Sequence, residues 1–402
     1  MDLTVVVVLV VVIALFFDFT NGFHDTANAM ATPIATGAIT PRVAVATAAV
    51  LNLVGAFLST EVAKTVSGGI LREGDGGAAV HPELIFAGLL GAIVWNMLTW
   101  LLGLPSSSSH ALFGGLIGAA IVGSGFGAVN FPVVVSKVIL PALLAPAVAG
   151  LSAFLCTRLA YALTRRYDAE SGEKLTQRRR GFKYGQIFSS SLVALSHGTN
   201  DAQKTMGVIT LVLIAAGLQP TGTGPELWVI AACALAIALG TYAGGWRIIR
   251  TLGAGLTDVK PAQGFSAETS TAAAILASSH LGFALSTTQV ASGSVIGSGL
   301  GRRGAGVRWG TAGRIVVGWV LTLPAAGIVG AIAAWGADLG TAGFIIVTVL
   351  AVGFIAVMFV RASRQRVSHE NALEVHAAGT AVDIPPKSRR RELARASRER
   401  RS

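Results

Sequence analysis

Two aspartates in similar surroundings, Asp25 and Asp201, are the residues of this chain best suited to do chemistry. Residues 21–30 read NGFHDTANAM, residues 197–206 read HGTNDAQKTM, and apolar sequence lies on both sides of each segment. An acidic side chain costs about 2.5 kcal/mol or more at the centre of a membrane helix, so its presence there indicates a function. A carboxylate also supplies the negative charge that a bound cation requires. The segments predict a site for a coupling cation, with these candidate residues: Asp25, Asp201, Asn200, Asn21, His24 and Glu268.

Other interpretations of these polar residues stay open. Each aspartate could instead cap a half-helix, and an acid near a helix start, such as Glu268, is also favoured by the helix dipole. His24 could change protonation near neutral pH and support proton coupling, or it could be a hydrogen-bonded structural residue. Lys204 takes the place that Asn28 has in the first segment, where it could neutralise Asp201 or contact an anion.

Two runs of hydroxyl residues predict the opposite chemistry. Residues 107–109 are three serines, residues 286–288 are Ser-Thr-Thr, and a short glycine-rich apolar segment follows each run. Such a run places neutral donors at the N-terminus of a helix, where the helix dipole favours an anion. One run alone would suggest simple capping, but two runs favour a tetrahedral oxyanion held between them. The candidate anion-binding residues are Ser107, Ser108, Ser109, Ser286, Thr287, Thr288, Asn28 and Lys204.

Both pairs of motifs occur in the same order, which indicates an internal duplication. Asp201 follows Asp25 by 176 residues, and Ser286 follows Ser107 by 179 residues. Duplications of this kind are typical of transporters whose discontinuous helices meet near the middle of the bilayer. The apolar stretches around the aspartates exceed the roughly 20 residues that span hydrocarbon, which predicts a helix break at each motif. The short segments after the hydroxyl runs predict re-entrant hairpins.

The elements that must position these residues are membrane helices. Of the 402 residues, 52% are hydrophobic, 13% are charged and 49 are glycines, which excludes an ordinary soluble protein. The first apolar stretch, residues 3–17, lacks the basic start of a signal peptide and is expected to be a membrane helix. Cys156 and Cys233 have no metal-ligand spacing, so we expect no disulfide, metal or cofactor. The basic residues lie next to predicted membrane segments, which argues against nucleic acid as a partner.

The distribution of lysine and arginine predicts the orientation of the chain in the membrane. With the N-terminus outside, nearly all of the 31 basic residues fall on the cytoplasmic side, as the positive-inside rule requires. Equivalent loops of the two halves differ in charge, since residues 66–83 are acidic and residues 247–265 are basic. This difference predicts halves of opposite orientation.

We therefore expect an all-α polytopic membrane protein with two inverted-topology repeats, discontinuous helices, re-entrant hairpins and about 10–12 transmembrane segments. The location is the cell inner membrane, with the lipid bilayer as partner and the C-terminus in the cytoplasm, and the sequence leaves a homo-oligomer open. The expected parts are a first repeat over 1–157, a basic cytoplasmic loop over 158–183, a second repeat over 184–337, a further transmembrane helix over 338–361 and a basic, disordered cytoplasmic tail over 362–402.

The motifs resemble those of the inorganic phosphate transporter (PiT) family over residues 3–360. The family signature is a Gly-x-Asn-Asp-x-x-Asn stretch in each half and a Ser-Thr-Thr-His hairpin, and residues 263–268, QGFSAE, resemble a further characteristic stretch. The resemblance implies a helical transporter, not an enzyme, that holds phosphate between paired hairpins and couples its symport to protons or sodium. The residues that match the signature are Asp25, Asn28, Asn200, Asp201, Lys204 and the hydroxyl runs.

Some positions depart from the family pattern. His24 replaces an asparagine, as in bacterial low-affinity members, Gln289 replaces the hairpin histidine, and Asn52 stands where animal members have glutamate. These differences favour protons as the coupling ion, with a neutral metal phosphate complex as a form of the substrate. Sulfate is the chief alternative substrate. An intramembrane hydrolase that uses the serine run and His110 is a remote alternative, because no Gly-x-Ser-x-Gly elbow occurs, and a scaffold protein would not explain the paired acids.

Overall fold

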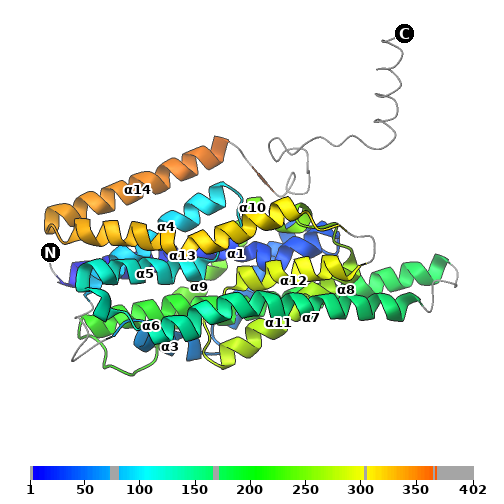
Figure 1. Ribbon diagram of the computed structural model, residues 1–402, viewed down its shortest axis with the longest axis horizontal. Coiled ribbons are helices and arrows are strands. Elements are labelled where there is room, and N and C mark those ends of the chain that lie inside the picture. The colour runs from blue at the N-terminus through cyan, green and yellow to red at the C-terminus, as the bar shows by residue number, and fades with distance from the viewer. Residues whose placement is uncertain (1–2, 73–80, 166–171, 303–305, 365–366, 369–402) are drawn as a thin grey trace, which may run out of the picture.

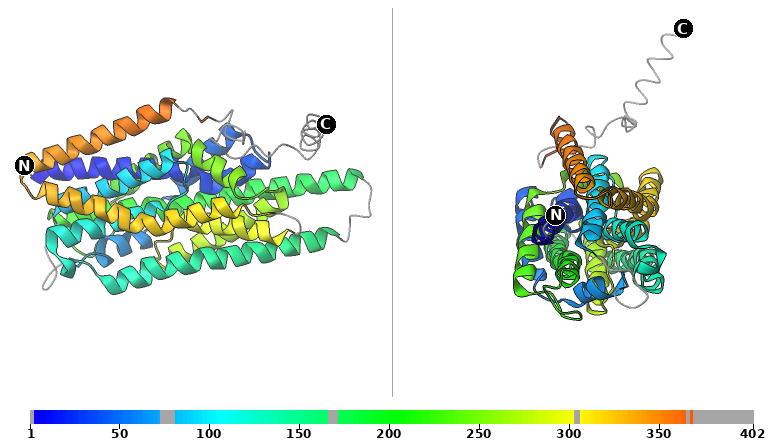
Figure 2. Two further views of the ribbon diagram at one scale, coloured as in Figure 1. Left: turned by 45° about the horizontal axis from the view of Figure 1, so that its top comes forward. Right: turned by 90° about the vertical axis from the view of Figure 1, so that its left-hand side faces the viewer.

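The computed structural model describes residues 3–72, 81–165, 172–302, 306–364 and 367–368, and it is a bundle of helices that run mostly along one axis (Figure 1). Figure 2 shows the same bundle from its end, where most of the helices point toward the viewer. The predicted all-α fold is confirmed. The helices of the first half are α1 (Leu3–Ala35), α2 (Pro41–Gly55), α3 (Glu61–Gly69), α4 (Pro82–Leu101), α5 (Ser108–Ser124), α6 (Phe131–Val134) and α7 (Leu140–Arg165).

The second half begins within a long helix and ends with one more helix than the duplication requires. Short π-helical turns, Val135–Ile139 and Thr251–Gly255, precede α7 and follow α10. The helices of the second half are α8 (Gly172–Ala215), α9 (Leu227–Ala243), α10 (Trp246–Arg250), α11 (Pro261–His280), α12 (Thr287–Gly301), α13 (Trp309–Ala337) and α14 (Thr341–Arg364).

Among the described residues, five helical segments are long and apolar enough to cross a membrane. They are α1, α4, residues 131–163, α13 and α14, and the bent pair α9 and α10 makes a sixth if it counts as one span. The predicted total of about 10–12 also includes helices such as α2 and α5, which are shorter, and α8 and α11, which carry polar residues. The outer helices expose large apolar side chains, such as Leu143 of α7 and Val320 of α13, as a lipid-facing surface requires.

Neither aspartate motif interrupts its helix, so the predicted breaks at Asp25 and Asp201 are wrong. The first motif lies inside the 33 residues of α1, and the second lies inside the 44 residues of α8. At 1.5 Å per residue α1 is about 50 Å long, so it can tilt or extend beyond the hydrocarbon without a break. These positions also rule out a capping role for either aspartate. The chain does break between α9 and α10, where the helix axis bends by 57° and Gly244 has a φ of 75°.

Two helical hairpins carry the hydroxyl runs, and they have the same local structure. In α4–α5 and α11–α12 a glycine in the left-handed region lies two residues after the end of the first helix, Gly103 with φ 65° and Gly282 with φ 67°. The tips of the hairpins meet, because the Ser109 hydroxyl of the first donates to the Leu285 carbonyl of the second over 3.2 Å. The two hydroxyl runs are thereby brought to one place in the protein.

Each hairpin is packed against a long helix from the other half of the chain. Helix α5 lies against α13, and α12 lies against α7. Glycines make both contacts close: a Cβ added at Gly118 would lie 1.9 Å from the Gly327 carbonyl oxygen, and one added at Gly297 would lie 1.9 Å from that of Gly150. In Figure 1, α7 runs from left to right and α13 runs from right to left.

Basic side chains join neighbouring helices of the bundle. Arg247 donates to the carbonyls of Leu101 and Ala362, and Lys183 donates to the carbonyl of Gly37. In the nearby loop before α11, a hydrogen bond from Lys260 lowers the pKa of Asp258, which also pairs with Arg302. The predicted loop 158–183 is helical at both of its ends. Residues 166–171 and most of the predicted tail lie outside the described residues.

Candidate functional site

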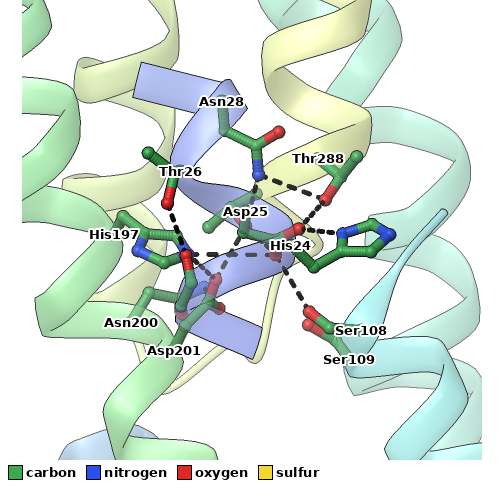
Figure 3. Close-up of polar contacts among 12 residues, drawn as sticks. His24, Asp25, Thr26, Asn28, Ser108, Ser109, His197, Asn200, Asp201 and Thr288 are labelled. Carbon is green, nitrogen blue, oxygen red and sulfur yellow. Dashed lines mark hydrogen bonds and ion pairs between the residues drawn. The ribbon is translucent and has the colours of Figure 1, made fainter. Parts of the chain in front are cut away.

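Asp25 lies at the centre of a buried group of polar side chains from α1, α5, α8 and α12 (Figure 3). Its Oδ1 is 2.7 Å from Nδ1 of His24 and accepts a hydrogen bond from the Thr288 hydroxyl over 3.1 Å. Its Oδ2 accepts from the Ser108 hydroxyl over 3.0 Å. The first aspartate therefore contacts a hydroxyl from each of the two hairpins.

Asp201 has an equivalent environment on α8. Its Oδ1 pairs with the ammonium of Lys204, and its Oδ2 lies 2.9 Å from Nε2 of His197. The Thr287 hydroxyl donates to the same Oδ2 over 2.7 Å. Lys204 and His197 reach Asp201 because they lie three and four residues away along a helix, which places all three on one face.

His197 connects the two aspartates, and sequence reasoning missed it. Its Nε2 is 3.8 Å from Oδ2 of Asp25 as well as 2.9 Å from Asp201, and its Nδ1 is 3.0 Å from Oδ1 of Asn52. One possible ligand atom from each of Asp25, His197 and Asp201 lies within 4.8 Å of the others, so this group could hold a small cation. The signal for it was present, because the duplication aligns His197 with Asn21 of the first motif.

The hydroxyl runs divide into capping residues and residues that face the aspartates. Ser107 accepts from the backbone N–H of His110 over 3.1 Å and Ser286 accepts from that of Gln289 over 3.3 Å, so both are N-caps. The other four hydroxyls reach into the site, and all of them are nearly inaccessible to solvent. They are Ser108, Ser109, Thr287 and Thr288.

The asparagines of the two motifs join the hairpins to the aspartate helices. Asn28 donates from Nδ2 to the Thr288 hydroxyl over 3.1 Å, and Asn200 donates to the carbonyl of Leu285 over 3.0 Å. Both asparagines are buried. Asn200 also donates from Nδ2 to Oδ1 of Asp201 over 3.1 Å, so each asparagine lies beside the group that it was predicted to join.

Two of the predicted cation residues lie outside this group. Glu268 accepts hydrogen bonds from Thr32, Gln186 and Ser189 over 2.6, 3.0 and 2.5 Å, in a separate buried cluster between α1, α8 and α11. Asn21 is buried, and neither of its side-chain polar atoms has a hydrogen-bond partner among the described residues. Spacing alone could not tell which face of a helix these residues occupy.

Lys204 takes part in both halves of the site. It is 1% exposed, it pairs with Asp201, and it donates to the Ser109 hydroxyl over 2.6 Å and to the Leu285 carbonyl over 2.8 Å. Two carboxylates and one ammonium leave a net negative charge if both histidines are neutral. An uncompensated buried charge is costly, so a bound cation or proton at the aspartates would stabilise this arrangement.

Comparison with known proteins gives a consistent result. The phosphate transporter family matches residues 21–330. A probable low-affinity inorganic phosphate transporter of Mycobacterium tuberculosis (strain ATCC 25618 / H37Rv) is 61% identical over 324 residues, 80% of this chain and 75% of the relative. Its counterpart in Bacillus subtilis (strain 168) is 43% identical over 333 residues, 82% of this chain and 97% of the relative. A solved structure described as the sodium-dependent phosphate transporter shares the fold, with a TM-score of 0.74 and 24% identity over 83% of this chain and 99% of its own.

Proposed function

The chain belongs to the phosphate transporter family as a multi-pass membrane protein, and we propose that it carries inorganic phosphate across the membrane in symport with protons. The observation that carries the proposal is the meeting of four hairpin hydroxyls with two aspartates and one lysine. This arrangement combines donors for an anion with acceptors for a cation. We assign phosphate binding to the two hydroxyl runs with Asn28 and Lys204, and cation binding to Asp25, Asp201 and their neighbours.

Phosphate and the two carboxylates compete for the same hydroxyl donors. Ser108, Thr287 and Thr288 donate to aspartate oxygens. A phosphate between the hairpins would take these donors and bring further negative charge next to Asp25 and Asp201. The exchange is unfavourable unless the carboxylates gain positive charge at the same time. Phosphate and cation therefore favour each other's binding, and by reciprocity the coupling acts equally in both directions.

Protons suit this site better than sodium. Each aspartate contacts one imidazole nitrogen, from His24 and from His197. Imidazole takes up and releases protons in the physiological range, whereas a hard metal cation prefers oxygen ligands. Sodium at the group of Asp25, His197 and Asp201 is the alternative. A neutral metal phosphate complex would lessen the repulsion from the carboxylates and is a second form of the substrate.

We also propose that the two halves are inverted repeats, with the N-terminus outside and the C-terminus in the cytoplasm of the inner membrane. The opposite directions of α7 and α13 in Figure 1 support inversion, because these helices follow equivalent motifs. The basic residues Lys183 and Arg302, which lie near the start of α11, support a cytoplasmic location for that end of the bundle. A site at the meeting point of two such repeats suits alternating access.

The test is phosphate uptake into proteoliposomes with pH and sodium gradients imposed separately. We expect uptake to follow the pH gradient, and sulfate to compete poorly. Asp25→Asn and Asp201→Asn should each abolish uptake while leaving the protein inserted, because neither amide can take up a proton. Asp338→Asn, at an exposed position after α13, is the matched control and should transport normally. Normal uptake by both site variants would refute the assignment.

A further inference from the structure

A third buried aspartate, Asp18, lies on α1 two helical turns before Asp25. Its side chain is 0% exposed, and neither carboxylate oxygen has a hydrogen-bond partner among the described residues. Asn21 lies one turn further along the same face and is 1% exposed, and its side chain also has no hydrogen-bond partner among the described residues. Buried polar groups normally have partners, so these two side chains together indicate a ligand.

The groups that face Asp18 come from α8 and α9. Thr205 of α8 is its neighbour, and the Thr205 hydroxyl is fully buried without a hydrogen-bond partner among the described residues. Thr205 lies one turn beyond Asp201, as Asp18 lies before Asp25. Asp18 and Thr205 therefore extend the buried polar residues of α1 and α8 beyond the site of Asp25 and Asp201. The titratable groups near Asp18 are Asp201, His197 and Lys204 from α8 and Cys233 from α9.

The duplication shows that the repeat does not need this pair in order to fold. At the spacing of 176 residues that relates the two aspartate motifs, Ala194 corresponds to Asp18 and Ala29 corresponds to Thr205. Both alanines are buried, as Asp18 and Thr205 are. Asp18 of the first half therefore corresponds to an alanine of the second, and Thr205 of the second half corresponds to an alanine of the first, so packing does not explain the acid or the hydroxyl.

We propose that Asp18, with Asn21 and Thr205, forms a second cation site, which binds a proton and exchanges it with the central aspartates. The proposal rests on the proposed proton symport. The exchange breaks one O–H bond, on the acid that gives up the proton, and forms one O–H bond, on an Asp18 carboxylate oxygen, whose hydroxyl can then donate to the Thr205 or Asn21 oxygen.

The ligand set fits a proton better than a metal ion. Helices α1 and α8 are continuous through this region, so their backbone carbonyls are engaged in helix hydrogen bonds. That leaves three side-chain groups, fewer than the six to eight oxygen ligands that calcium, for example, takes. A proton needs one oxygen. Asp18 lies between the start of α1 and Asp25, and this position places it on a route from one face of the membrane to the central site.

The experiment compares two activities of Asp18→Asn in proteoliposomes. The first is accumulation of phosphate driven by a pH gradient, and the second is exchange of labelled for unlabelled phosphate at equal pH, which needs no net proton movement. We expect loss of accumulation with exchange retained, because the amide keeps the size and polarity of Asp18 but cannot carry a proton. Thr210→Val, which removes another buried hydroxyl of α8 without a partner among the described residues, is the matched control and should keep both activities.

Infrared spectroscopy provides a readout that does not depend on transport. The wild-type spectrum should contain a carbonyl component from protonated Asp18 that is missing from the spectrum of Asp18→Asn, whereas any components from the other buried acids stay. Wild-type accumulation by the variant, loss of both activities, or identical carbonyl bands in the two proteins would each overturn the role of Asp18. Failure of the wild-type protein to transport phosphate would instead refute the proposed function. Uptake driven by sodium alone would refute proton binding both at Asp18 and at the central aspartates.

Discussion

The two halves use the same polar residue types in exchanged positions. The first motif has Asn21 and His24 before its aspartate, and the second has His197 and Asn200 at the corresponding places. In the structure each aspartate still has a histidine close by: Asp25 lies 2.7 Å from the adjacent His24, and Asp201 lies 2.9 Å from His197, one turn earlier. The chemistry of the site is therefore kept although the alignment pairs histidine with asparagine.

At the scale of single residues, the candidate site was largely predictable, because polar residues in motifs that occur twice stand out from the other polar residues of the chain. Ser108, Thr287, Asn28 and Lys204 were predicted from repeated motifs, and the structure brings them to the aspartates. Glu268 was chosen from its residue type in an apolar segment, and it lies in a separate cluster. Its proposed role in cation passage stays a prediction. A residue type indicates chemistry, but only packing decides which face of a helix it occupies.

The pairing of Lys204 with Asp201 predicts strong energetic coupling. Lys204→Gln should destabilise the protein by about 3–5 kcal/mol, because it leaves a buried carboxylate without its charge partner. Asp201→Asn should also destabilise it, but the double variant should lose less than the sum of the two. Thermal unfolding in detergent would measure all three.

Lys64→Gln is the control for this cycle. Lys64 forms an exposed ion pair with Glu61, and such pairs contribute little to stability. Its unfolding midpoint should stay close to that of the wild-type protein. Additive losses in the Lys204 and Asp201 cycle would contradict a direct interaction between the two side chains.

At the scale of elements, the hairpins were predictable and the course of the aspartate helices was not. A hydroxyl run followed by a short apolar segment correctly indicated α5 and α12. The long apolar stretches suggested breaks at the motifs, yet α1 and α8 pass through them without interruption. The length of an apolar stretch shows only how many of its residues are apolar. Whether the helix continues through a polar motif depends on neighbouring helices, which here supply hydrogen-bond partners for the polar side chains.

The close contacts of α5 with α13 and of α12 with α7 predict that their glycines cannot be replaced. Gly118→Ala and Gly297→Ala would each place a methyl group 1.9 Å from a backbone oxygen, so the helices must move apart. We expect each variant to lose about 1–3 kcal/mol of stability, as overpacked cores do. The midpoint of thermal unfolding would show the loss.

Gly313→Ala, within α13, is the control for these substitutions. A Cβ at Gly313 meets nothing within 4 Å. Alanine is the better helix former, so this variant should be unchanged or more stable by roughly 0.5–1 kcal/mol. If all three variants had equal midpoints, the close approach of the helices would not limit stability.

At the scale of the whole molecule, each half completes its packing with helices from the other. Helix α13 covers the first hairpin and α7 covers the second, while α9 packs on α1 and α2 packs on α8. Sequence analysis could predict a duplication but not this exchange of partners, because nothing in a motif indicates which distant helix will cover it. Movement of one hairpin relative to the other would change access to the site between them, as in other transporters built from repeats.

The opposite orientation of the halves is testable by labelling from the two sides of the membrane. Phe126, after α5, is 70% exposed, and Gly306, before α13, is exposed with no atom within 4 Å of an added Cβ. These positions follow equivalent hairpins, so inverted halves place them on opposite faces. In a protein whose Cys156 and Cys233 are replaced, Phe126→Cys should react with an impermeant maleimide from outside. Gly306→Cys should react only after the membrane is permeabilised, because its end of the protein carries arginines, which the positive-inside rule predicts to lie in the cytoplasm.

The same labelling pattern bears on the mechanism as well as the topology. Two hairpins that enter from opposite faces bring their helix N-termini together at the site, so that both runs of hydroxyls can donate to one anion. Hairpins that entered from the same face would point their helix N-termini in the same direction, so the two runs of hydroxyls would not face one anion from opposite sides. Reaction of both cysteines from one side would therefore contradict the shared phosphate site along with the inverted repeat.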